Sequence, residues 1–146
     1  MGERREVTAV LTDNKVHFQA VSRDCISIDI DYPPPLGEGN GYTSLEIFLI
    51  SLATCSGTSV TALLRRMGKS ITGLKVHASG IRKDQHPTSF ETIHLNFEIS
   101  GDADDISVQK AIRTSEEMFC PVWAMIKGNV KVTTGFSITE QILETE

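Results

Sequence analysis

Residues 44–68 read SLEIFLISLATCSGTSVTALLRRMG, and this stretch decides how the chain folds. Its apolar side chains recur at steps of three and four residues, which is the period of one helix face. Thr43 or Ser44 can cap the start of the helix, which should end at Met67-Gly68-Lys69. The pattern therefore predicts one continuous helix, the longest in the protein.

The predicted helix carries no charged residue between Ile47 and Leu64. A helix without a charged face through about four turns is covered on nearly all sides. A monomer of 146 residues can hardly provide that cover. The Ala, Ser, Thr and Gly residues of the stretch also allow another backbone to approach closely. We therefore expect a second copy of the chain to cover part of this helix, in a homodimer.

The flanking sequence predicts a mixed α+β fold. Three stretches before the helix alternate apolar and polar side chains, as antiparallel strands do. After the helix, two long stretches that alternate apolar and polar side chains predict a hairpin with one solvent-exposed and one buried face. A second helix starts at Asp104 or Asp105 and a short one at Pro121. No repeat or linker divides the chain, so residues 1–146 are expected to form a single domain. The predicted strands are 5–12, 15–22, 25–31, 73–83, 88–100 and 129–137.

Charge and composition narrow the classes of partner. Fourteen Lys and Arg stand against nineteen Asp and Glu, which gives a net charge of −5 and a pI near 5.4. Nucleic acid and anionic lipid repel such a chain, so neither is an expected partner. The first twenty residues contain no signal-peptide apolar run, and the long helix contains Glu46 and several hydroxyl residues. We therefore expect a soluble, cytoplasmic protein.

The three cysteines are too few and too widely spaced for a disulfide framework, and no Cys/His spacing indicates a metal site. Cys55 lies among small residues of the long helix. It is either a packing residue or a nucleophile whose thiolate receives hydrogen bonds from nearby hydroxyls. Cys120 precedes Pro121 at a helix start, where unpaired N–H groups lower the pKa of a thiol; the alternative is a cap packed under Trp123. Cys25 is most simply a packing residue at a strand edge.

Two other polar residues, Glu46 and His86, each allow a structural and a functional interpretation. Glu46 either caps the long helix or meets groups of a partner subunit; it lies about 180° around the helix from Cys55 and roughly 13 Å along it, so it cannot be the base for that thiol within one chain. His86, at the predicted hairpin tip, is either solvated or a donor to a site across a dimer. The Pro- and Gly-rich segment 32–41 carries only a weak phosphate-loop signal.

Three segments occur in order along the chain: TSLEIFLISLATCSGTSV followed by LLRRMGK, then HPTSFETIHLNFEISG, then CPVWAMIKGNVKVTTGFSI. The first contains Cys55 and the third begins with Cys120. With these segments, residues 5–138 resemble the OsmC/Ohr superfamily, the osmotically induced and organic-hydroperoxide-resistance proteins. The pattern is most similar to a less characterised branch, which has a P-x-E-L-like helix start and an H-P turn.

The resemblance implies an intertwined homodimer of chains with strongly curved antiparallel sheets around a central helix, and two sites at the subunit interface. It also implies a thiol peroxidase: Cys55 attacks an organic hydroperoxide and becomes a sulfenic acid, and Cys120 condenses with it to a disulfide. A dithiol such as dihydrolipoamide then reduces the disulfide, and no metal or flavin cofactor is required. We expect an apolar substrate pocket from residues near the two cysteines in sequence: Phe48, Leu52, Met118, Phe119 and Trp123.

The chain departs from the well-studied members of this superfamily in the groups that activate the first thiol. Their Glu stands ten residues before the cysteine, where this chain has Leu45, and the acid follows as Glu46. Their early Arg has no counterpart in the first turn. The candidates left to lower the pKa of Cys55 are the hydroxyl cluster around it and three groups of either subunit: Lys15, Arg23 and His86.

The expected function is therefore organic hydroperoxide reductase, with two alternatives left open. The first is a thiol redox sensor or small-ligand-binding dimer without steady turnover, which the missing Arg and Glu favour. The second is a stress-response protein with inert, buried cysteines.

Overall fold

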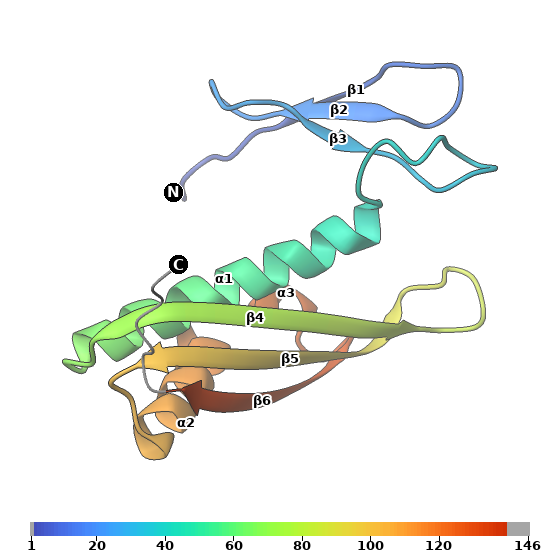
Figure 1. Cartoon of the computed structure of the whole chain (residues 1–146). Helices are drawn as coiled ribbons and strands as arrows, with labels where there is room; N and C mark the ends of the chain where they lie inside the picture. Colours follow the sequence, from blue (N-terminus) through green and yellow to red (C-terminus); the bar gives the residue numbers. More distant parts are fainter. Residues whose placement is uncertain (1, 140–146) are drawn as a thin grey trace. The chain divides into compact units, whose positions relative to one another are not determined.

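The computed structural model describes residues 2–139, and its contacts divide the chain into two compact units. One unit ends at Phe48 and the other begins at Leu49 (Figure 1). Helix α1 (Ser44–Arg66) starts in the first unit and continues without a break into the second. The long helix expected from the sequence is confirmed.

The first unit contains a small antiparallel sheet. Strands β1 (Thr8–Leu11), β2 (Phe18–Val21) and β3 (Ile28–Ile30) pair in the order β1-β2-β3. The carboxylate of Asp13 accepts the backbone N–H of Lys15 at 2.9 Å in the turn between β1 and β2. The predicted meander is confirmed, although its strands are shorter than predicted because such turns take up part of the alternating sequence.

The Pro- and Gly-rich loop after β3 wraps around the buried carboxylate of Asp31. Oδ1 of Asp31 accepts the N–H of Tyr32 at 2.7 Å, and Oδ2 accepts those of Asn40 at 3.0 Å and Glu38 at 3.3 Å. Gly37 passes so close that a Cβ there would lie 2.2 Å from Oδ1 of Asp31. The loop's own carboxylate therefore occupies N–H groups that a phosphate would need.

A capping box starts α1. The N–H of Thr43 donates to Oε1 of Glu46 at 2.9 Å, and the N–H of Glu46 donates to Oγ1 of Thr43 at 3.2 Å. Each side chain thus satisfies a backbone donor that the first helical turn leaves unpaired. Glu46 is therefore a helix cap, as the first of its two sequence readings expected.

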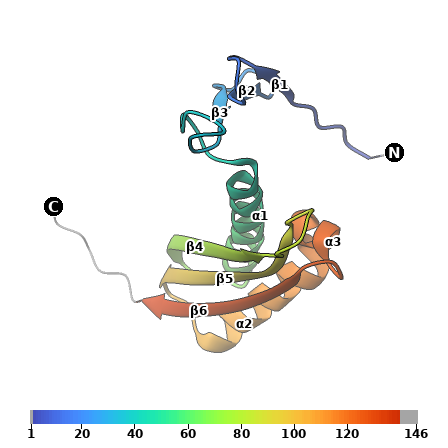
Figure 2. The same ribbon diagram turned by 90° about the vertical axis from the view of Figure 1, so that its right-hand side faces the viewer.

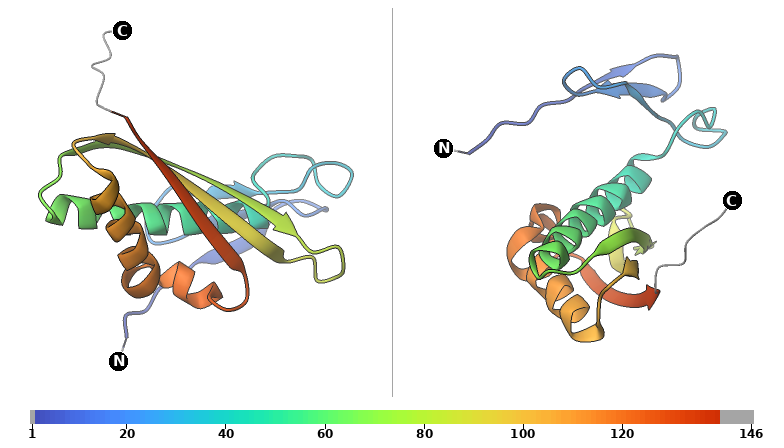
Figure 3. Two further views of the ribbon diagram at one scale, coloured as in Figure 1. Left: turned by 90° about the horizontal axis from the view of Figure 1, so that it is seen from below. Right: turned by 60° about the vertical axis from the view of Figure 1, so that its left-hand side comes forward.

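The sheet of the second unit consists of a long hairpin and one further strand (Figure 3). Strands β4 (Ile71–Arg82) and β5 (Phe90–Gly101) pair antiparallel, whereas β6 (Lys131–Thr139) pairs parallel to β5. The α+β class is confirmed, but the expectation of antiparallel sheets is wrong for β6. Residues 102–130 cross back over the sheet before β6 pairs, and such a crossover gives a parallel neighbour.

Helices cover one face of this sheet (Figure 2). From Ile93 to Ile99 every second residue of β5 is buried, and the residues between them are polar. Apolar residues of the helices complete the core of the second unit. The buried β5 residues are Ile93, Leu95, Phe97 and Ile99, and those of the helices include Leu52, Val60, Leu64, Val108, Ala111 and Trp123.

The crossover contains three short helical segments. They are α2 (Asp105–Thr114), a π-helical turn (Ser115–Phe119) and α3 (Pro121–Ile126). The N–H of Cys120 donates to the carbonyl of Ser115 at 2.8 Å where the π-helical turn ends. The sequence pattern predicts the two α-helices but not the turn between them, which places Cys120 in the bend before α3.

Candidate functional site

The second unit brings together two cysteines that are far apart in the sequence. Cys55 lies in the middle of α1, and Cys120 lies between the π-helical turn and α3. Both residues are free thiols, and they lie close enough for Cys120 to raise the pKa of Cys55. Oγ of Ser56, the residue that follows Cys55, lies 3.4 Å from Sγ of Cys120, so the fold brings the two cysteines into one neighbourhood.

Cys120 is the buried member of the pair, with 2% of its surface exposed. Its extended backbone caps α3, and its sulfur accepts the N–H of Trp123 at 3.4 Å. Oγ of Ser56, the residue that follows Cys55, lies 3.4 Å from the same sulfur. Cys120 is therefore a helix cap, as one of its two sequence interpretations expected, and its sulfur is held between α1 and α3.

Cys55 is the more accessible member of the pair, since it is only partly buried. Burial raises the pKa of the Cys55 thiol above its ordinary value. The N–H of Val122 donates to the sulfur and acts in the opposite direction, but the neighbouring Cys120 adds to the rise. Cys55 is therefore mainly the neutral thiol at neutral pH.

This arrangement permits a two-step sulfur chemistry. A partly exposed thiol can meet a reagent that does not reach the buried one. Its oxidation to a sulfenic acid would place a leaving group directly beside the second sulfur, which could then close a disulfide.

Two of the cations expected near the thiols lie in the first unit. Nζ of Lys15 lies 2.7 Å from Oε2 of Glu38, and this hydrogen bond raises the pKa of Lys15. Arg23 has a φ of 56° in the β2–β3 turn and lines an apolar hollow of about 440 Å³ in that unit together with Cys25. Cys25 is exposed and lies in this turn rather than in β3, so the prediction that it opens a strand is wrong.

His86 lies in the second unit, at the tip of the β4–β5 hairpin. Its side chain is exposed, as the solvated reading expected. Any part it plays at a site across a dimer stays a prediction.

The residues expected to form a substrate pocket are distributed unevenly. Leu52 and Trp123 are buried in the core of the second unit, while Met118 and Phe119 are 72% and 48% exposed. Phe48 is the last residue of the first unit. Exposed side chains do not enclose a cavity within one chain, so the apolar pocket stays a prediction.

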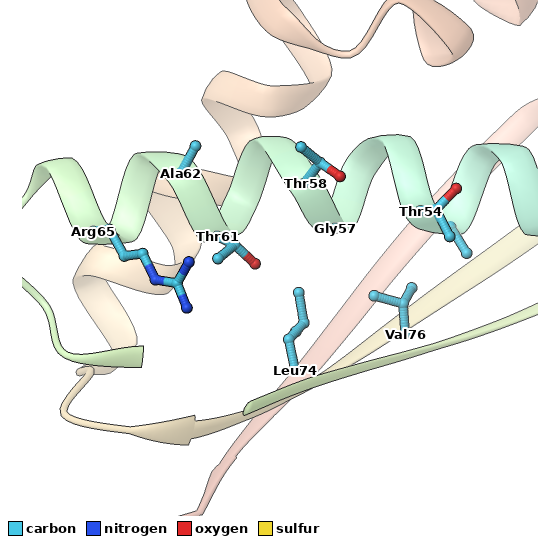
Figure 4. A pocket seen from close by; sticks show the side chains of 9 residues that line it. Thr54, Gly57, Thr58, Thr61, Ala62, Arg65, Leu74 and Val76 are labelled. Atoms are coloured by element: carbon cyan, nitrogen blue, oxygen red, sulfur yellow. The ribbon is translucent and has the colours of Figure 1, made fainter. Parts of the chain in front are cut away.

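A groove of about 570 Å³ runs between α1 and β4 (Figure 4). The side chains of Leu74 and Val76 point from β4 toward the helix, and Arg65 closes one end, with its Nη2 donating to the carbonyl of Ile71 at 3.2 Å. Small side chains of α1 line the opposite side and leave its backbone open to close approach. They are Ala53, Thr54, Gly57, Thr58, Thr61 and Ala62.

The sequence predicts that hydroxyls near Cys55 donate to its own thiolate, whereas the hydroxyl of Ser56 contacts Cys120, and the backbone donors are not predicted by the sequence. Ser56 and the backbone N–H groups of Val122 and Trp123 all contact the pair. A buried serine needs a hydrogen-bond partner, but its burial is not visible in the sequence. No group of three or more His, Cys, Asp or Glu side chains that could hold a metal occurs among residues 2–139.

Comparison with known proteins assigns the chain to a family. The family model of the OsmC-like protein matches residues 37–135. Protein YhfA of Escherichia coli K12 is 26% identical over 95 residues, which are 64% of this chain and 71% of that protein.

Solved structures share the fold at low identity. A hypothetical protein from Aquifex aeolicus VF5 has a TM-score of 0.85 at 23% identity, over 97% of this chain and 100% of that chain. An organic hydroperoxide resistance protein OsmC from Legionella pneumophila has a TM-score of 0.73 at 18% identity, over 92% of this chain and 97% of that chain. Since the family model spans more than half of the sequence, from the Gly-rich loop to β6, the chain belongs to the OsmC-like protein family.

Proposed function

We propose that this protein is a thiol peroxidase that reduces organic hydroperoxides. The observation that carries the proposal is that the fold places Cys120 against the segment of α1 that holds Cys55, with Sγ of Cys120 3.4 Å from Oγ of Ser56. Two neighbouring sulfurs that close to a disulfide hold the oxidising equivalents of one peroxide. Cys55 is the more exposed of the two and meets the peroxide, and the buried Cys120 resolves the product.

The cycle balances with a hydroperoxide and a dithiol as co-reactants. The Cys55 thiolate attacks the terminal peroxide oxygen; an S–O bond forms, the O–O bond breaks, and the alkoxide takes a proton and leaves as an alcohol. The Cys120 thiolate then attacks the Cys55 sulfur; the S–S bond forms, the S–O bond breaks, and hydroxide takes a proton and leaves as water. A dithiol of the dihydrolipoamide type reduces the disulfide and becomes a disulfide itself.

The functional unit in this proposal is a cytoplasmic homodimer. By length and composition alone α1 could cross a bilayer, and 33% of its apolar window is buried within the chain. Large apolar residues of the first unit are also exposed, with Ile26 at 91% and Ile28 at 52%. A second copy that covers these surfaces would avoid their exposure to water. It would also give the Cys55 site access to the cations of two chains, of which Lys15, Arg23 and His86 are the expected ones.

Peroxide consumption tests the proposal. Wild-type protein should consume cumene hydroperoxide continuously in the presence of dihydrolipoamide. Cys55→Ser and Cys120→Ser should each abolish multiple turnover because one of the two sulfurs is missing. Cys25→Ser is the matched control, since this exposed thiol lies in the other unit, and it should keep full turnover. Normal turnover by Cys55→Ser would end the proposal.

A second function, a thiol redox sensor without steady turnover, is favoured by the raised pKa of Cys55. A thiol peroxidase reacts through its thiolate, and a raised pKa lowers the fraction of thiolate at neutral pH. Stopped-flow oxidation separates the two functions. A rate constant for Cys55 no higher than that of free cysteine supports the sensor, and a far higher one supports the peroxidase.

A further inference from the structure

We propose that Ser56 is a positioning residue for disulfide closure: its hydroxyl holds the sulfur of Cys120 beside Cys55 and donates a hydrogen bond to the Cys120 thiolate. This inference rests on the proposed two-cysteine cycle and concerns its second step. Ser56 touches neither peroxide nor dithiol in that cycle and acts through Cys120.

The contact between Ser56 and Cys120 is fully enclosed. Oγ of Ser56 lies 3.4 Å from Sγ of Cys120, Ser56 is 0% exposed and Cys120 is 2% exposed. Water therefore does not solvate the sulfur when it ionises. A buried anion is costly unless protein donors replace the lost water, so the donors around this sulfur decide how readily it becomes a thiolate.

Ser56 departs from the usual behaviour of a hydroxyl inside a helix. Such a hydroxyl commonly donates to the carbonyl four residues earlier. Thr54, two residues before Ser56, does this by donating to the carbonyl of Ile50 at 2.7 Å. The Ser56 hydroxyl is instead paired with a sulfur that belongs to a different element of the unit.

Trp123 supplies a second hydrogen bond to the sulfur of Cys120. The N–H of Trp123 donates to Sγ at 3.4 Å, because Cys120 caps α3. A thiolate has no proton to donate, so in the ionised state the hydroxyl of Ser56 supplies the hydrogen. The sulfur is then held by donors from both α1 and α3, with Cys55 next to Ser56 on α1.

These donors act on the step in which the Cys120 thiolate attacks the Cys55 sulfenic acid, forming the S–S bond and releasing water. Hydrogen bonds to a charged group are among the stronger ones in proteins. Loss of the hydroxyl should therefore leave a smaller fraction of Cys120 ionised and slow closure at neutral pH about tenfold.

A direct measurement of this pKa does not depend on peroxidase activity. In a Cys25→Ser, Cys55→Ala background, Cys120 is the one remaining thiol, and its ultraviolet thiolate absorbance can be followed against pH. Adding Ser56→Ala should move the titration midpoint up by about one unit. Ser51→Ala is the matched control, because this serine is exposed on the same helix, and it should leave the midpoint in place.

The kinetic arm uses wild-type Cys55 and Cys120 in the Cys25→Ser background and follows fluorescence of the protein's one tryptophan, Trp123. Ser56→Ala should leave the first phase, oxidation of Cys55, unchanged and slow the second phase about tenfold at neutral pH. The variant and wild-type rates of the second phase should converge at alkaline pH, where both thiols are ionised.

Each outcome bears on one claim. An unchanged titration midpoint in Ser56→Ala overturns the role of Ser56. A second phase that is slowed equally at every pH overturns it too, because that result would be a packing effect alone. If wild-type Cys55 is not oxidised by cumene hydroperoxide, the proposed function fails, while the midpoint still decides whether Ser56 stabilises the thiolate. Ser56→Thr, which keeps the hydroxyl, should restore the wild-type midpoint.

Discussion

Cys55 and Cys120 are neighbours in the fold, but different groups surround their sulfurs. One backbone donor, from Val122, acts on Cys55, whereas Cys120 has the Trp123 N–H and the Ser56 hydroxyl within reach. Burial and the neighbouring thiol leave Cys55 with a raised pKa. Reactivity at Cys55 should therefore be limited by the fraction of thiolate.

This limit predicts a steep pH dependence of Cys55 alkylation. A raised pKa means that the thiolate gains population with rising pH beyond the range of an ordinary cysteine. In the Cys25→Ser protein, the rate of iodoacetamide labelling of Cys55 should rise about tenfold per pH unit and should not level off near neutral pH. Mass spectrometry resolves the labelled peptide. A plateau between pH 6 and 7 would instead show that a cation of the assembled protein activates the thiol.

The residue scale was also the hardest to predict from the sequence. The small neighbours and hydroxyls of Cys55 indicated a nucleophile, but residue spacing carries no information on whether it meets Cys120 in space. Ser56 appears in the sequence as one hydroxyl residue among several in the long helix. The contact between Ser56 and the sulfur of Cys120 depends on how α3 packs against α1. The local pattern of residues in the sequence does not determine that packing.

At the scale of elements, α1 depends on the capping box at its first turn. Thr43→Ala removes the hydroxyl that accepts the Glu46 N–H at 3.2 Å, so the free energy of unfolding should fall by about 1 kcal/mol. Glu46→Gln keeps an oxygen that can accept from Thr43 and should change it far less. Urea unfolding measures both. If Glu46→Gln lost peroxide turnover while its free energy of unfolding stayed close to that of the wild type, this carboxylate would also serve the site.

The loop around Asp31 predicts acid sensitivity. Burial acts to raise the pKa of Asp31, but hydrogen bonds from the N–H groups of Asn40, Tyr32 and Glu38 outweigh it and lower the pKa below its ordinary value. A carboxyl whose pKa is lower in the folded than in the unfolded state stabilises the fold above its unfolded pKa, about 3.9. That stabilisation is lost as pH falls through the folded value.

The expected result is a stability difference that disappears in acid. Asp31→Asn should lower the urea midpoint at neutral pH, because an amide offers one acceptor oxygen where the carboxylate offers two. The two midpoints should approach each other as the pH falls below about 4. A constant difference across this range would mean that the carboxylate charge does not hold the loop.

Helices and strands could be predicted from the sequence where the periodicity is strong. The direction of a strand and the type of a helical turn could not. The three- and four-residue spacing gave α1 almost to its last residue, Arg66. The alternation in residues 129–137 indicated a strand but not that β6 runs parallel to β5, since both directions use the same period. The turn Ser115–Phe119 has helical spacing, and its π-helical hydrogen bonds are set by the tertiary fold.

At the scale of the whole molecule, the exposed apolar surfaces predict that the chain forms a homodimer. We expect size-exclusion chromatography with light scattering to show a dimer. Ile26→Lys replaces a 91% exposed apolar residue with a charge, so it should leave the fold intact and raise the dimer dissociation constant about 100-fold if it lies in the interface. Glu91→Lys, at an exposed polar position, is the control. A wild-type monomer would contradict the homodimer.

The parallel pairing of β6 with β5 also bears on the order of events during synthesis. Residues 102–130 carry Cys120, and this connection is anchored at both ends once β6 has docked on the strand that precedes it. Closing so long a connection is slow compared with forming a hairpin. A nascent chain in which β6 has not yet paired with β5 therefore leaves one end of this connection free, so Cys120 should reach its fixed place near Cys55 only after β6 has been synthesised and has docked.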